Sequence, residues 1–158
     1  MRGSRSAEDY NAYLNGLFHW AMPHLTPLPS ISKMNKYNPL KALDPAEWLA
    51  MDEGERIALV QEYHRRAKVR LPNQIAHAAI HAVVETQIAG HEVPAREALE
   101  RLMIEGLDRH DAVHAIGSVL AGHIHKLTTH SESSSAPNAD YCRDLKTLTA
   151  AKWRQEYS

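Results

Sequence analysis

The sequence predicts an all-α fold, a compact bundle of about six helices that follows a proline-rich N-terminal arm. Apolar residues recur at helical spacing along most of the chain, and the alternating pattern of strands is almost absent. Helix-starting Asp and Pro residues and helix-ending Gly residues separate these segments. The 158 residues have the length of one domain. We therefore expect an N-terminal helix and arm over residues 1–40 and a helical bundle over residues 41–158.

The N-terminal segment combines an aromatic helix with an extended connection. Residues 9–21 carry Tyr, Leu and Phe side chains at helical spacing, whereas residues 23–40 contain four prolines and little periodicity. A helix on such an arm must cover its aromatic face, either on its own bundle or on a second copy of the chain. The pattern favours a homodimer, because the prolines lower the entropic cost of an extended arm.

Start and stop signals divide the rest of the chain into helices. Asp44 caps the first, Asp52 and Glu55 form a capping pair for the second, and Asp108 caps the longest. The composition of residues 128–138 is typical of a linker. Short loops on both sides of the fourth helix predict an up-down-up arrangement, in which the third and fifth helices run parallel. The predicted helices span residues 45–49, 53–67, 72–89, 94–105, 109–127 and 139–153.

The helix over residues 72–89 has almost no polar face, so we expect neighbours on most of its sides. Its polar exceptions include His77, His81 and Glu85, which are four residues apart and therefore share one side of the helix. Burying such groups without partners costs about 1–3 kcal/mol each. The line His77–His81–Glu85 must therefore be paired with other groups.

The helix over residues 109–127 offers those partners. His110 and His114 repeat the four-residue spacing, and the small residues Gly117 and Gly122 would let two helix backbones approach closely. His64 should lie near the same end of the bundle. Because imidazoles four residues apart can direct their nitrogen atoms at one ion, this pattern predicts a site for zinc or iron. It also predicts that the His77 and His114 rings lie within about 10 Å, since zinc–ligand bonds are about 2 Å long. The predicted ligands are His77, His81, Glu85, His110 and His114.

Other functions use patterns that can be checked in the sequence. It contains no HExxH motif of zinc proteases, no Gly-rich phosphate loop and no Ser or Cys nucleophile motif. The pairs His81–Glu85 and His110–His114 are similar to the central helices of hemerythrins, but the His-x4-Asp of that family is absent, so dioxygen binding is a minor alternative. The main alternative is a non-catalytic interaction or adaptor module with a protein partner, in which the His and Glu side chains form a purely structural network. The pattern leaves open whether the protein is an enzyme.

Two longer segments together resemble a bacterial family of small helical proteins that is classed only as a domain of unknown function. They are "LPNQIAHAAIHAVVETQIAG" (residues 71–90) and "ALERLMIEGLDRHDAVHAIGSVLAGHI" (residues 98–124), with the signature HxxxHxxxExQ plus DRHxxxH. The resemblance implies a helical fold and a bacterial origin, and it brings no established activity. It also implies a shared constellation of His77, His81, Glu85, Gln87, His110 and His114.

Composition excludes several partners. The 18 basic and 19 acidic residues nearly cancel, so no overall field would attract nucleic acid or an anionic membrane. No apolar run approaches the roughly 18 residues of a membrane helix. The single cysteine, Cys142, cannot form an intrachain disulfide, which fits a reducing compartment. We therefore expect a cytoplasmic protein that binds neither membrane nor nucleic acid.

Overall fold

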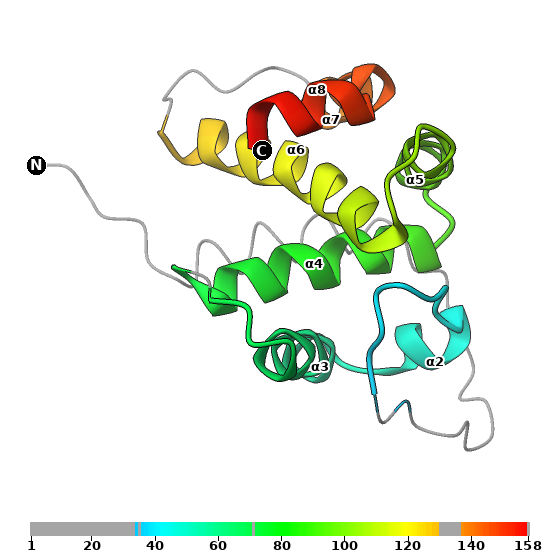
Figure 1. Cartoon of the computed structure of the whole chain (residues 1–158), viewed down its shortest axis with the longest axis vertical. Coiled ribbons are helices and arrows are strands. Elements are labelled where there is room, and N and C mark those ends of the chain that lie inside the picture. The colour runs from blue at the N-terminus through cyan, green and yellow to red at the C-terminus, as the bar shows by residue number, and fades with distance from the viewer. Residues whose placement is uncertain (1–33, 35, 71, 130–136, 158) are drawn as a thin grey trace, which may run out of the picture. The chain divides into compact units, whose positions relative to one another are not determined.

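The structure is a computed structural model that describes residues 34, 36–70, 72–129 and 137–157. Within these residues the chain is built from helices and contains no strand, so the predicted all-α fold is confirmed (Figure 1). The predicted helix over residues 9–21 and most of the arm lie outside the described residues. The helices are α2 (Pro45–Ala50), α3 (Glu53–Arg66), α4 (Gln74–Ala89), α5 (Val93–Ile104), α6 (Arg109–Thr129), α7 (Pro137–Thr147) and α8 (Ala150–Tyr157).

Side-chain caps explain where most helices begin. The Asp52 carboxylate accepts a hydrogen bond from the Glu55 N–H while the Glu55 carboxylate accepts one from the Asp52 N–H, which is the predicted capping box of α3. Asp108 accepts from the N–H of Asp111 (2.8 Å) and caps α6. The start of α4 differs from the prediction, because Asn73 caps this helix and Pro72 precedes the cap.

The predicted helix over residues 139–153 is wrong, since the chain forms two helices there. Thr149 lies between α7 and α8, and its hydroxyl accepts a hydrogen bond from the Lys152 N–H (3.2 Å). The Glu105 carboxylate accepts from the Ala150 N–H (2.6 Å). These acceptors satisfy two N–H groups in the first turn of α8, which helps a new helix to start at this point.

Helix α4 is central and packs against α2, α3, α5 and α6, with α2 and α3 below it and α5 and α6 above it in Figure 1. In Figure 1, α4 and α6 lie across the view whereas α3 and α5 point nearly along it. The predicted parallel arrangement of α4 and α6 is wrong. Glu85, late in α4, contacts Arg109 at the start of α6, while His77, early in α4, lies beside His114, so the two helices run in opposite directions. The reason is that α5 crosses them, and the two short loops turn corners instead of reversing the chain.

Two groups of buried apolar side chains surround α4. The first lies among α4, α5, α6, α7 and α8, and includes Leu102, Ile116 and Leu145. The second lies among α2, α3, α4 and the segment before α2, and includes Tyr37 and Trp48. Tyr37 lies in the predicted arm, yet its side chain is fully buried here. No helix in the described part of the chain is long and apolar enough to cross a membrane.

Candidate metal centre

Five histidine rings gather where α3, α4 and α6 meet. His64 lies in the last turn of α3, His77 and His81 on α4, and His110 and His114 in the first two turns of α6. The centroids of neighbouring rings are between 4.2 Å (His110 and His114) and 6.1 Å (His64 and His114) apart. The His77 and His114 rings are 5.0 Å apart, which confirms the predicted approach of these two residues.

The nitrogen atoms of four of these rings have a spacing that suits one ion. One nitrogen each from His64, His77, His81 and His114 lies within 4.8 Å of all the others. The Nε2 atoms of His64 and His77 are 3.3 Å apart. Tetrahedral zinc with Zn–N bonds of about 2.0–2.1 Å would hold its nitrogen ligands about 3.3 Å from one another. The His64–His77 pair already has that separation, and a pair as far apart as 4.8 Å would need to close by about 1.5 Å.

Three imidazole nitrogen atoms in this cluster are buried without a hydrogen-bond partner. They are the Nε2 atoms of His81, His110 and His114. Their rings are mutual neighbours, with centroids 4.2–5.2 Å apart. A buried polar atom without a partner costs about 1–3 kcal/mol, and native structures keep few of them. Three of them in one place call for a bound group that satisfies them together.

Burial keeps these imidazoles neutral. Burial away from solvent is the main cause that lowers the pKa of His77, His110 and His114 to about 4, and repulsion from neighbouring imidazoles lowers it further. The same causes lower the pKa of His81 well below its usual value, and burial lowers that of His64. At pH 7 each ring therefore carries one nitrogen lone pair, which is the form that binds a metal.

Hydrogen bonds define which nitrogen of two rings is free. His64 Nδ1 lies 2.9 Å from the carbonyl oxygen of Val60, which can only accept, so Nδ1 carries the proton and Nε2 the lone pair. His81 Nδ1 lies 3.0 Å from the hydroxyl of Tyr37, and that hydroxyl donates its own proton to Glu85 Oε1 (2.7 Å). His81 must therefore donate from Nδ1, which leaves the Nε2 lone pair directed into the cluster.

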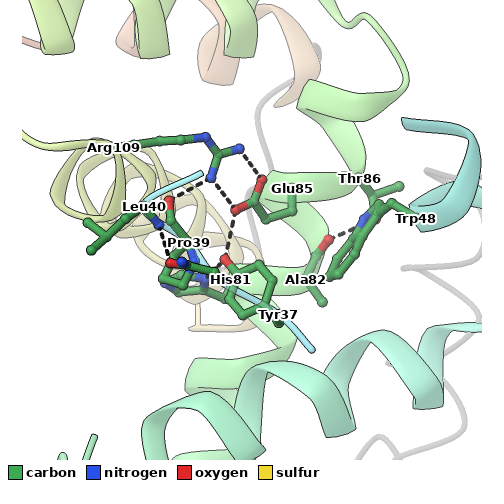
Figure 2. A network of polar contacts seen from close by, with 10 residues as sticks. Tyr37, Pro39, Leu40, Trp48, His81, Ala82, Glu85, Thr86 and Arg109 are labelled. Atoms are coloured by element: carbon green, nitrogen blue, oxygen red, sulfur yellow. Dashed lines mark hydrogen bonds and ion pairs between the residues drawn. The ribbon is translucent and has the colours of Figure 1, made fainter. Parts of the chain in front are cut away.

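Glu85, which the sequence predicts as a ligand, has a different set of partners. Its side chain is fully buried and bonded to both terminal nitrogens of Arg109, at 2.7 and 2.6 Å (Figure 2). With the Tyr37 hydroxyl as a third partner, its oxygen atoms are well occupied. The group of closely spaced candidate ligand atoms contains His64 and does not contain Glu85 or His110. The structure thus separates the predicted set into inward-facing imidazoles and a neighbouring carboxylate–guanidinium pair.

Sequence reasoning missed Tyr37 and Arg109. A buried Glu on an apolar helix needs a cation, and Arg109 directly precedes the first His of α6, so this signal was available. Tyr37 gave no signal, because it lies in a proline-rich stretch without periodicity. His64 was expected near this end of the bundle but was not in the predicted ligand set. Gln87 faces elsewhere, since its oxygen accepts a hydrogen bond from the Tyr141 hydroxyl of α7 (2.9 Å).

Comparison of the chain with protein-family models, with curated proteins and with solved structures found no match. The resemblance to a bacterial family of unknown function therefore stays a prediction from the sequence.

Proposed function

We propose that this protein binds one divalent transition-metal ion, zinc or iron(II), in the histidine cluster between α3, α4 and α6. The observation that carries the proposal is the group of three neighbouring rings, those of His81, His110 and His114, whose buried Nε2 atoms lack partners. His64 and His77 complete the site, with Nε2 atoms 3.3 Å apart. The proposed ligands are His64, His77, His81 and His114, with His110 as a fifth donor.

The type of donor atom narrows the choice of ion to the transition metals. Imidazole suits zinc, iron, copper and nickel, whereas magnesium and calcium prefer oxygen ligands. The Glu85 carboxylate beside the cluster is paired with Arg109, so its charge is already compensated. The proposed ligands are all neutral, and a bound ion would keep its full double positive charge.

Two other readings have weaker support. The metal-free interaction module gains support from the Tyr37–Glu85–Arg109 network, which is complete without an ion, and from exposed apolar side chains such as Ile104. It leaves the three Nε2 atoms without partners. Hemerythrin-like dioxygen binding would use Glu85 as a metal ligand. This alternative is weaker because the Glu85 carboxylate is already paired with Arg109.

The test is metal analysis and titration of the full-length protein. We expect up to one zinc or iron ion per chain after purification, and a single saturating site when the metal-free protein is titrated with zinc. Zinc at 100 times its dissociation constant should add about 2.7 kcal/mol to the free energy of unfolding, and a chelator should remove this gain.

His114→Ala and His125→Ala form a matched pair, because both residues lie on α6 and His125 is exposed outside the cluster. His114→Ala should weaken zinc binding at least tenfold, since it removes a ligand, and His125→Ala should leave it unchanged. A wild-type protein that takes up no zinc or iron(II) and melts at the same temperature with and without them would contradict the proposal and favour the metal-free module.

A further inference from the structure

A hydrogen-bonded chain leads from the histidine cluster to a buried ion pair. The Tyr37 hydroxyl lies 3.0 Å from His81 Nδ1 and 2.7 Å from Glu85 Oε1. A carboxylate only accepts hydrogen bonds and a phenol has one proton, so the protons point in one direction along the chain. His81 donates to Tyr37, and Tyr37 donates to Glu85.

The segment that carries Tyr37 is attached to the same network at a second point. The carbonyl oxygen of Pro39 accepts a hydrogen bond from Arg109 Nη1 (2.9 Å), and the same guanidinium holds Glu85 (Figure 2). The Tyr37 ring packs against Trp48 and Tyr63, with centroids 5.7 and 5.8 Å away. Tyr37 is fully buried, although it lies outside the helices. We call residues 36–41 the strap.

We propose that Tyr37 is a positioning residue of the metal centre, through which the Glu85–Arg109 pair acts on the ligand His81. The proposal rests on the proposed function. A metal-bound histidine whose other nitrogen donates to a carboxylate or carbonyl has a fixed orientation and a stronger donor atom, and losing such a partner weakens metal binding about 10–100-fold. In this protein the tyrosine hydroxyl is inserted between the histidine and the carboxylate.

The coupling must also act in the opposite direction. If docking of the strap strengthens the binding of an ion, the ion strengthens the docking of the strap by the same factor. Backbone amides of residues 36–41 whose exchange requires release of the strap should therefore exchange more slowly in the zinc-saturated protein. The Glu85 carboxylate would thus serve the metal centre without contacting the ion.

Tyr37→Phe tests the relay, with Tyr141→Phe as its matched control. Tyr37 is buried and Tyr141 is partly buried, and the hydroxyl of Tyr141 donates to Gln87 on the other side of the bundle. Zinc affinity is measured for the full-length variants by competition with a chromophoric chelator. We expect about 10–100-fold weaker binding for Tyr37→Phe and a change of less than about threefold for Tyr141→Phe. Equal affinity of Tyr37→Phe, Tyr141→Phe and wild type would overturn the proposal.

A second measurement does not depend on the variant folding. The nitrogen chemical shifts of His81 in the metal-free wild type should report a proton on Nδ1 and none on Nε2. A proton on Nε2 would overturn the relay. This measurement also separates the two proposals, because a wild type that binds neither zinc nor iron(II) would end the proposed function, while the tautomer of His81 would still test the relay.

Discussion

The apolar core among α4, α5, α6, α7 and α8 and the polar centre where α3, α4 and α6 meet are held together by different means. The core among α5, α6, α7 and α8 contains apolar side chains such as Leu102 and Leu145, which are fully buried. Where α3, α4 and α6 meet, the buried side chains include His64, His81, Glu85 and Arg109, which account for all the buried polar or charged side chains in the described part of the chain. The apolar core excludes water with groups that need no partner, whereas each buried polar group of the polar centre depends on another.

This difference has consequences for substitutions. Truncating an apolar side chain leaves a cavity whose cost depends on how well the neighbours collapse into it. Truncating one member of a polar network leaves its partner buried and unpaired, and packing of the neighbours into the space does not remove this cost. The apolar core should therefore respond to volume, and the polar centre to charge and hydrogen bonding.

The largest effect is expected for Glu85→Ala. The substitution leaves the Arg109 guanidinium, which is 7% exposed, without its carboxylate. Breaking a buried ion pair costs about 3–5 kcal/mol, compared with about 2–5 kcal/mol for a truncation such as Leu102→Ala in the apolar core. Urea unfolding of the metal-free variants measures both values.

The double variant Glu85→Leu/Arg109→Met sharpens this comparison. It replaces both charges with apolar side chains and should recover much of the stability that Glu85→Ala loses, because no charge then stays unpaired. Glu62→Ala is the surface control. Its carboxylate pairs with Arg65, whose side chain is 71% exposed, so the loss should be within about 1 kcal/mol. A Glu85→Ala variant that unfolds like Glu62→Ala would show that water reaches the ion pair.

The pH dependence of stability should come mainly from the polar centre. The imidazoles of His77, His110 and His114 have a pKa of about 4 in the folded protein and about 6.5 in the unfolded chain. Between these values the unfolded chain binds more protons, so the free energy of unfolding falls as the pH drops from about 6.5 to 4 and levels off above about 6.5. Each imidazole contributes up to about 1.4 kcal/mol per pH unit in this window.

Urea unfolding of the metal-free protein at several pH values measures this slope. His114→Leu should flatten it by about the contribution of one imidazole, whereas His125→Ala, on the exposed part of α6, should keep it. A metal-free wild type whose stability does not change between about pH 4.5 and 6.5 would show that the cluster is hydrated and titrates as it does in the unfolded chain.

Much of the helical architecture can be predicted from the sequence, because helix starts and helix faces depend on local signals. Asp52 with Glu55 and Asp108 mark the starts of α3 and α6, where the structure places them. Helical spacing brought His77, His81, His110 and His114 to two facing helices. These features depend on residues a few positions apart, which is the range over which periodicity and capping act.

The features that could not be predicted depend on contacts between distant residues. The direction of α6 relative to α4 is set by how α5 packs across both, which loop length alone does not determine. Tyr37 and Glu85 are 48 positions apart, and Arg109 and Pro39 are 70 apart. No local pattern links these pairs, so the assignment of Glu85 to the ion pair required the three-dimensional structure.

The smallest effects on stability are expected for alanine substitutions at two glycines of α6, Gly117 and Gly122. A Cβ atom added to Gly122 would meet nothing within 4 Å, so Gly122→Ala should stabilise the protein by about 0.5–1 kcal/mol through helix propensity alone. A Cβ atom on Gly117 would lie 3.0 Å from Cγ2 of Ile80 on α4, so the Ile80 side chain or the two helices would have to shift by a few tenths of an ångström. Overpacking of this kind costs about 1–3 kcal/mol, so Gly117→Ala should destabilise the protein in spite of the same gain in propensity.

Because Gly117 lies three residues after His114, wider spacing of α4 and α6 should also weaken zinc binding. Thermal unfolding and zinc titration of both variants measure these effects. If Gly117→Ala stabilises as much as Gly122→Ala and binds zinc like the wild type, the polar centre does not require the close approach of these helices.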